Sequence, residues 1–267
     1  MKKYILVTGA YGGMGRAAVK LLLERGFVVF ALDRKVEEKA ETENIIPIET
    51  DITDEGSIAS AFEKISELTD TLFAVIHFAG IYMLDSLVEI DTSDFERIFK
   101  VNLEGAYLVN KMFFPLLKQN SRIIITTSEL ASLDPLPFTG IYAVTKAALD
   151  KYAYSLRMEL QLKGVGVSVL RAGAVDTGML GVSTEALDRF NEKTEIYSCN
   201  AQRFKSIVNK VEAKCVPPSR VAAKVVKILG KKRPSFAYSI NRNPLLLLLN
   251  ALPKRLQFWI IGLILKE

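Results

Sequence analysis

The chain has 267 residues, of which 49% are hydrophobic and 24% charged, with a formal net charge of +5. This composition excludes disordered, collagen-like and fibrous proteins, and the length is sufficient to bury one large core. Two cysteines and a single histidine, His77, exclude a disulfide framework, a four-cysteine zinc site and a multi-histidine centre. We therefore expect no metal site and a reducing, cytoplasmic location.

Short apolar runs alternate with helical patterns along most of the chain. The runs predicted as strands are Tyr4–Val7, Val28–Leu32, Ile45–Ile48, Phe73–Phe78, Ile123–Thr127, Val167–Leu170 and Ser235–Ser239. The stretches with helical periodicity are Met14–Arg25, Ser57–Leu68, Asp94–Leu117, Tyr142–Lys163 and Ser219–Leu229. This alternation predicts an α/β fold of Rossmann type, in which helices cover both faces of one doubly wound parallel sheet.

No linker or repeat divides this pattern, so we predict a single domain over residues 1–267. Ser57 is the expected N-cap of the second helix. Gly26 and Gly164 stand where helices are expected to end.

A glycine-rich turn, TGAYGGMG at Thr8–Gly15, follows the first predicted strand and opens the first helix. Glycines let the backbone turn tightly, and a helix N-terminus offers N–H groups and a positive dipole end to a phosphate. A turn that merely needs glycine is the alternative. We predict that the cofactor is bound here by Gly9, Tyr11, Gly13, Met14 and Gly15.

Asp33, at the end of the second predicted strand, indicates which dinucleotide binds. It lies 18 residues after Gly15, where a carboxylate can accept hydrogen bonds from an adenosine ribose. A carboxylate repels the 2′-phosphate of NADP, so Asp33 favours NAD. The neighbouring Arg34 could accept that phosphate, so NADP is not excluded.

Further motifs follow in a fixed order. They are Asp51-Ile52, His77-Phe78-Ala79-Gly80, Asn102 in VNLEGAY, Ser128 at the end of ITTS, Tyr142-Ala-Val-Thr-Lys146, and Ala172-Gly173 through Thr177. With these motifs the chain resembles the short-chain dehydrogenase/reductase family up to about Ser239. The resemblance implies hydride transfer between a nicotinamide and a secondary alcohol or ketone by a homodimer or homotetramer. It also implies cofactor contacts by Asp51, Ile52, Ala79, Gly80, Asn102, Tyr142, Lys146, Gly173, Val175 and Thr177.

Tyr142 and Lys146 lie four residues apart on one predicted helix and therefore share a face. A phenol with a pKa near 10 is a weak base at neutral pH, and a neighbouring ammonium favours the phenolate. A pKa near 7 requires about 4 kcal/mol of differential stabilisation. Tyr142 is thus the candidate general acid/base. By the resemblance, Lys146 also holds the nicotinamide ribose, Ser128 hydrogen-bonds the substrate oxygen, and Asn102 holds a water behind Lys146.

Three positions depart from the family pattern. His77 and Phe78 replace the asparagines of the usual NNAG turn, and His77 is expected to be a buried, hydrogen-bonded structural residue rather than a substitute brace. Ser128 precedes Tyr142 by 14 residues, whereas 13 is commoner, so the intervening loop is expected to be one residue longer. Ala172 replaces the usual proline, which loosens the turn that follows.

Residues 178–218 break the alternation of strands and helices, and we expect them to form a lid over the substrate. They carry the apolar side chains Met179, Leu180, Leu187, Phe190, Tyr197 and Phe204. Substrate specificity in the family lies in this region, and no cluster of polar sugar-binding residues occurs here. The expected substrate is an apolar alcohol or ketone that is steroid-, retinoid- or lipid-like.

Residues 241–267 form a C-terminal tail with two apolar runs, Leu245–Leu249 and Phe258–Leu265. Neither run approaches the ~20 residues needed to span a bilayer. Residues 203–267 contain 14 Lys or Arg and two acids, a net charge of +12, whereas the preceding residues carry −7. This pattern favours peripheral contact with an anionic membrane. Packing of the leucines against the pocket or a second subunit, with a solvated basic face, remains an equal alternative.

Other functions fit the sequence less well. A non-catalytic nucleotide-sensing regulator on the same fold would be favoured by the loss of Tyr142 or Lys146, and both are present. A nucleic-acid binder would interleave aromatic residues with Lys and Arg on an exposed face, whereas the aromatic residues here lie in apolar runs, so no nucleic-acid partner is expected. Among enzymes, the alternative is an NADP-dependent keto or acyl reductase.

Overall fold

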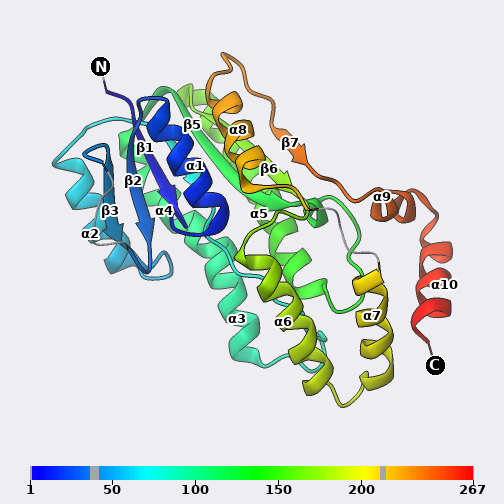
Figure 1. Ribbon diagram of the computed structural model, residues 1–267. Coiled ribbons are helices and arrows are strands. Elements are labelled where there is room, and N and C mark those ends of the chain that lie inside the picture. The colour runs from blue at the N-terminus through cyan, green and yellow to red at the C-terminus, as the bar shows by residue number, and fades with distance from the viewer. Residues whose placement is uncertain (1, 37–41, 211–214, 267) are drawn as a thin grey trace.

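Seven parallel strands form one sheet in the computed structural model, which describes residues 2–36, 42–210 and 215–266. The spatial order of the strands is β3-β2-β1-β4-β5-β6-β7 (Figure 1). The strands are β1 (Tyr4–Thr8), β2 (Val28–Asp33), β3 (Ile45–Glu49), β4 (Leu72–His77), β5 (Leu117–Ser128), β6 (Gly166–Ala172) and β7 (Ala237–Ile240). The doubly wound parallel sheet is thus confirmed, and its switch point lies between β1 and β4.

Helices cover both faces of this sheet (Figure 1). They are α1 (Gly13–Glu24) and α8 (Pro218–Leu229) on one face, and α2 (Glu55–Ser66), α4 (Gly105–Phe113) and α5 (Gly140–Leu160) on the other. Successive side chains of a strand point to opposite faces, so Ile5 and Val7 of β1 pack under α1 and α8, while Leu6 packs under the other three helices. Burial on both faces explains why the strands are continuous apolar runs.

Two glycines end helices as predicted, whereas one predicted cap is wrong. Gly26 and Gly164 have φ values of +78° and +72°, the left-handed conformation that glycine adopts without strain. The N-cap of α2 is Asp54, whose carboxylate accepts a hydrogen bond from the Gly56 nitrogen. Ser57 lies inside the helix instead, because its hydroxyl accepts a hydrogen bond from the backbone nitrogen of Asp51.

The predicted helix Asp94–Leu117 is interrupted in the structure. It consists of α3 (Thr92–Phe99), a π-helical turn at Lys100–Glu104, then α4. Sequence periodicity does not reveal a π-helical turn, which adds one extra residue to an α-helix and is common at functional sites. The turn matters for the site because it contains Asn102 and buries that side chain.

Four helices of the C-terminal third lie beyond the sheet and the helices that cover its faces (Figure 1). They are α6 (Gly178–Lys193), α7 (Ser198–Lys210), α9 (Pro244–Ala251) and α10 (Lys254–Leu265), with α10 beside α7. A third apolar cluster includes Phe190 of α6, Phe204 of α7 and Leu265 of α10. Residues 211–214 of the expected lid and the side chains of Met179 and Leu180 lie outside the described residues.

Candidate active site

A cavity of about 850 Å³ opens at the carboxyl ends of β1, β2 and β4. Small-molecule and cofactor sites are typically about 300–1,000 Å³. Many of the predicted cofactor-binding residues line this cavity: Gly9, Tyr11, Gly13, Met14, Gly15, Asp33, Asp51, Ile52, Ala79, Gly80 and Thr177. The other predicted residues lie outside its wall: Asn102, Tyr142, Lys146, Gly173 and Val175.

Three glycines of the turn lie so close to other residues of the chain that a Cβ at their positions would collide with those residues. Gly9 has a φ of +65°, and a Cβ there would lie 2.6 Å from the Ala79 nitrogen. A Cβ on Gly15 would overlap the Gly9 carbonyl oxygen, and one on Gly13 would lie 2.7 Å from Thr177 Cβ. The turn therefore lies directly against β4 and the loop after β6. In this position the N-terminus of α1 faces the cavity, as phosphate binding requires.

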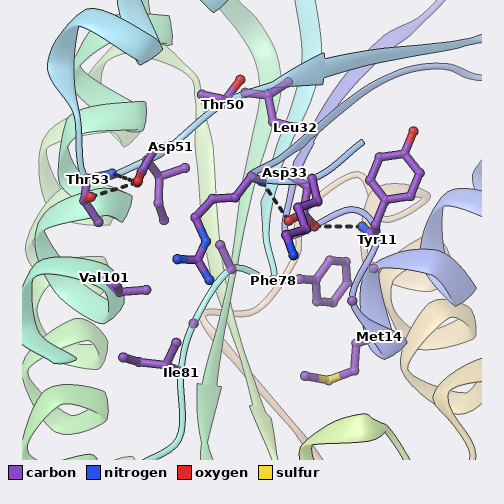
Figure 2. Close-up of a pocket in the computed structure, with 18 of the residues that line it drawn as sticks. Tyr11, Met14, Leu32, Asp33, Thr50, Asp51, Thr53, Phe78, Ile81 and Val101 are labelled. Atoms are coloured by element: carbon purple, nitrogen blue, oxygen red, sulfur yellow. Dashed lines mark hydrogen bonds between the residues drawn. The ribbon is translucent and has the colours of Figure 1, made fainter. Parts of the chain in front are cut away.

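Asp33 lies at the end of β2 and faces this turn (Figure 2). Its Oδ2 accepts a hydrogen bond from the Tyr11 nitrogen at 3.0 Å, and its Oδ1 accepts one from the Arg34 nitrogen at 2.8 Å. Two backbone donors thus fix the carboxylate on the cavity wall. Arg34 and Lys35 line the same cavity.

Asp51 and Thr53 lie on the opposite side of the cavity from Asp33 (Figure 2). Asp51 Oδ1 accepts hydrogen bonds from the Thr53 nitrogen at 2.8 Å and from the Thr53 hydroxyl at 2.7 Å. The backbone hydrogen bond from Thr53 holds the pKa of Asp51 below its usual value, against the opposing effect of burial. A fixed, ionised acceptor therefore stands at this end of the cavity.

The residues present fit a nicotinamide dinucleotide. Gly9, Gly13 and Gly15 line the cavity at the start of α1 with backbone alone, and cationic side chains favour a pyrophosphate. Within the described ranges, no group of three His, Cys, Asp or Glu side chains is arranged to hold a metal ion.

Three of the predicted catalytic residues meet at the carboxyl end of β5. Ser128 is the last residue of β5, and Tyr142 and Lys146 lie one turn apart in α5. The side chain of Ser128 hydrogen-bonds that of Tyr142. The Lys146 Nζ lies 5.6 Å from the centroid of the Tyr142 ring. The geometry thus combines a phenol, a hydroxyl and an amine, the groups needed for proton transfer to a substrate oxygen.

The pKa of Tyr142 differs from what the four-residue spacing predicts. Burial raises the pKa of Tyr142 and the neighbouring Tyr82 raises it further, whereas the hydrogen bond with Ser128 lowers it. Burial also lowers the pKa of Lys146 to about 8. Desolvation disfavours the charged form of each group. In the protein alone this effect outweighs the attraction between an ammonium and a phenolate.

Asn102 is held from two directions. Its Oδ1 accepts a hydrogen bond from the Ile81 nitrogen at 2.8 Å, and its Nδ2 donates to the Ile81 carbonyl and to the Thr145 hydroxyl. A Cβ on Gly80 would lie 3.2 Å from both Asn102 Oδ1 and Lys146 Nζ. Asn102 and Lys146 therefore face each other across Gly80, a residue of the cavity wall. Thr145, which sequence reasoning did not select, completes this arrangement.

His77 is buried at the end of β4, as expected for a structural residue. Its Nε2 lies 2.9 Å from Asn110 Oδ1, and Asn110 Nδ2 donates to the Tyr152 hydroxyl. Burial lowers the pKa of His77 to about 4, so the ring is neutral at physiological pH. This network links β4 to α4 and α5 and lies apart from Tyr142.

Two aromatic residues that sequence reasoning missed lie beside the site. The Tyr82 ring centroid is 4.9 Å from that of Tyr142. Phe138 belongs to the loop between Ser128 and Tyr142, and its φ of +67° is rare for a non-glycine residue. Its ring centroid lies 4.5 Å from that of Phe190 in α6. The unusual Ser128-to-Tyr142 spacing was the one signal that pointed to this loop.

The loop after β6 returns the chain to the glycine turn. A Cβ on Gly173 would overlap the Asn241 carbonyl oxygen, so the first residues of the tail lie directly against this loop. Val175 is buried and pairs with Val216, and Thr177 reaches the cavity wall. Ala172, in place of proline, is an ordinary strand residue paired with Ser128.

The chain belongs to the short chain dehydrogenase family. The sequence model of that family matches residues 3–188, which include β1 to β6 and the Tyr142–Lys146 pair. Members of this family are oxidoreductases that use NAD or NADP.

Two curated relatives illustrate the range of the family. The chain is 33% identical to mouse estradiol 17-beta-dehydrogenase 2 over 208 residues, which cover 72% of this chain and 55% of the mouse protein. The chain thus spans little more than half the length of that relative. It is 35% identical to the 3-amino-tetrahydro-pyrrolizinone reductase of Xenorhabdus hominickii over 205 residues, or 73% of this chain and 71% of the reductase.

Solved structures agree with the fold. A short chain dehydrogenase from Burkholderia cenocepacia J2315, determined in complex with NADP, superposes with a TM-score of 0.71 at 24% identity. The superposition covers 90% of this chain and 89% of that one. At this level of identity the likeness establishes the architecture.

Proposed function

We propose that the protein transfers a hydride between NAD and an apolar secondary alcohol or ketone, with Tyr142 as general acid/base. The observation that carries this proposal is the meeting of Ser128, Tyr142 and Lys146 at the end of β5, beside a cavity that fits a dinucleotide. Gly80 connects the cavity with the catalytic residues, because it lines the cavity and lies next to both Lys146 and Asn102.

Each side chain has a distinct task in this mechanism. Bound NAD supplies the hydride acceptor. During oxidation the Tyr142 phenolate would accept the O–H proton of the alcohol while the hydrogen on the alcohol carbon leaves as hydride, and during reduction the Tyr142 phenol would donate that proton to the substrate oxygen. Ser128 Oγ accepts a hydrogen bond from the Leu130 nitrogen. Its hydroxyl hydrogen-bonds Tyr142 in the protein alone and would donate instead to the substrate oxygen as charge develops there. Lys146 stabilises the Tyr142 phenolate and binds the nicotinamide ribose, and Asn102 holds a water behind Lys146.

An apolar substrate is supported by the surroundings of Tyr142. Tyr82 packs on Tyr142 and also belongs to the apolar cluster that contains Leu187, Phe190 and Phe204 of the segment 178–218. We assign this segment as the lid, and the whole chain as one domain. A steroid-, retinoid- or lipid-like molecule matches a wall of this composition.

A panel of alcohols tests the proposal. With NAD, we expect hydroxysteroids or retinol to be oxidised with a kcat/KM at least about 100-fold above that of 2-butanol, because each buried CH₂ contributes about 0.8 kcal/mol. The same panel run with NADP and with no cofactor is the control. Equal rates for all alcohols would refute the apolar substrate, and no oxidation of any would refute the reaction.

Replacement of Asp33 by Ala tests the cofactor preference. We expect the dissociation constant of NAD to rise roughly 10- to 100-fold, because an ionised acceptor of ribose hydrogen bonds contributes about 1.5–3 kcal/mol. NADP binding should improve relative to NAD, since the charge that repels the 2′-phosphate is removed. Fluorescence titration with both cofactors measures this. Glu49→Ala, on the neighbouring residue of β3, is the matched control, and unchanged constants for Asp33→Ala would show that Asp33 does not bind the ribose.

An NADP-dependent keto or acyl reductase is the second candidate. Arg34 and Lys35 line the cavity beside Asp33, and either cation could bind a 2′-phosphate. Preferential reduction of keto or acyl substrates with NADPH in the same panel would establish this alternative.

The proposed setting is a homodimer or homotetramer in the cytoplasm, in peripheral contact with anionic membranes. Among the helices of the described residues, none is long and apolar enough to cross a membrane. The surface proposed to make this contact is in the C-terminal tail.

A further inference from the structure

The tail carries an apolar face that no other described part of the chain covers. On α9, the side chain of Leu248 is 64% exposed. On α10, Phe258, Trp259 and Leu263 are 72%, 62% and 67% exposed. We call these four residues the outer face. Exposed large apolar side chains concentrated on two consecutive short helices mark an interaction site rather than random surface composition.

Only one side of α10 packs against the protein. Gln257, Ile261 and Leu265 recur every four residues and form an inner stripe, which faces the apolar cluster around α6 and α7. A helix that is apolar on all sides normally has all sides covered, by protein or by lipid. The outer face of α10 therefore lacks the cover that its composition requires.

Polar contacts hold the tail in this orientation. The Asn243 nitrogen donates to Glu129 Oε2, and the Asp134 nitrogen donates to Asn250 Oδ1 at 2.6 Å. Further along, Asn200 Nδ2 of α7 donates to the Leu265 carbonyl at 2.6 Å. These contacts anchor the start of the tail to the loop after β5 and its end to α7. The helix α10 lies at the edge of the molecule beside α7 (Figure 1), and the outer face is exposed there.

The positive charge of the tail indicates an anionic partner. Between Glu212 and Glu267 the sequence has no acidic residue, while Arg242, Lys254, Arg255 and Lys266 flank the outer face in sequence. A second copy that packed through the same face in a symmetric pair would bring these cations together. Lys254 is already paired with Asp134 and Arg242 interacts with Glu129. A phospholipid surface that contains anionic headgroups would instead attract the remaining cations, Arg255 and Lys266.

We propose that the outer face docks on an anionic phospholipid surface, with α9 and α10 lying in its plane and Trp259 among the headgroups. Helices of this kind bury an apolar face at the boundary of headgroups and acyl chains. The proposal rests on the peripheral contact in the proposed function and gives it a surface and an orientation. Since α10 packs on α7, docking also places the lid at the membrane, where an apolar substrate dissolves.

Trp259 is the only tryptophan of the chain, so its fluorescence reports on the outer face directly. The full chain is mixed with vesicles of phosphatidylcholine, with or without about 30 mol% phosphatidylglycerol. We expect a blue shift of Trp259 emission and co-sedimentation with the anionic vesicles at low salt, and reversal of both by salt. A chain that stays in the supernatant, with unshifted emission, overturns the proposal.

Two variants separate docking from other roles. Phe258→Ser combined with Leu263→Ser should weaken co-sedimentation more than about tenfold, since both substitutions remove apolar surface that docking would bury. Leu68→Ser, at an exposed leucine after α2, is the matched control and should bind normally. If the double variant instead changes the sedimentation coefficient of the free protein, the face joins two copies of the chain and the proposal is wrong.

Failure of docking is distinguishable from failure of the proposed function. Oxidation of a water-soluble secondary alcohol is measured without vesicles, and the double variant should retain that rate and the melting temperature of the parent. Vesicle binding by a protein that oxidises no alcohol supports docking and refutes the activity. Normal oxidation without vesicle binding supports the activity and refutes docking.

Discussion

Replacement of Tyr142 by Phe is expected to lower kcat by roughly 10²- to 10⁴-fold, the usual contribution of a general acid/base. Phe retains the ring that packs 4.9 Å from Tyr82 and loses only the hydroxyl that hydrogen-bonds Ser128. The shape of the site is therefore preserved, and the dissociation constant of NAD should remain nearly unchanged. Steady-state oxidation of the best alcohol of the panel, together with a cofactor titration, measures both quantities.

Tyr154→Phe is the matched control for this variant. Tyr154 lies on the same helix, α5, and its side chain is exposed. The control should have the kcat of the parent chain. A Tyr142→Phe enzyme with nearly normal turnover would show that another group moves the proton.

Replacement of Lys146 by Ala is expected to lower both the rate of the reaction and the affinity for NAD. The rate should fall by roughly 10²- to 10⁴-fold because the phenolate of Tyr142 loses its neighbouring ammonium. The dissociation constant of NAD should rise roughly 10- to 100-fold, because a hydrogen bond from a charged group contributes about 1.5–3 kcal/mol. The same kinetic assay and cofactor titration measure the two effects.

Lys151→Ala, at an exposed lysine of α5, controls for the loss of a positive charge from this helix. It should change neither quantity. If Lys146→Ala lowers the rate while NAD binding is unaffected, Lys146 does not hold the ribose and acts on Tyr142 alone. If binding weakens and the rate at saturating NAD is normal, its role is confined to the cofactor.

Much of the fold follows from local patterns. The central strands are buried on both faces, so they appear as continuous apolar runs, as β1 and β2 do. The start of β5 was not predictable, because the strand begins at Leu117 with exposed polar residues before its apolar run. The ends of helices are less predictable, because several residue types can cap. Asp54 rather than Ser57 caps α2, since the Ser57 hydroxyl bonds the Asp51 nitrogen, a contact across a turn that a helical pattern does not contain.

Some residues of the candidate site were predictable from the sequence and others were not. The glycine turn and Asp33 are predictable, because their spacing within one βαβ unit brings them together, and the structure joins Tyr11 to Asp33. Tyr82 and Phe138 were not predictable. Tyr82 packs on Tyr142 and Phe138 packs on Phe190 of α6. Both contacts depend on loop conformations, such as the φ of +67° at Phe138, that are set by tertiary packing.

By itself, the sequence determined the parallel α/β sheet, the family, the dinucleotide turn and the Tyr142–Lys146 pair, because each is encoded within a short stretch of chain. Only the tertiary structure decided how Asn102 is buried by a π-helical turn and which side of α10 remains exposed. It also decided that burial raises the pKa of Tyr142. These properties arise where distant segments meet, since desolvation and packing depend on everything around a side chain and not on its neighbours in sequence.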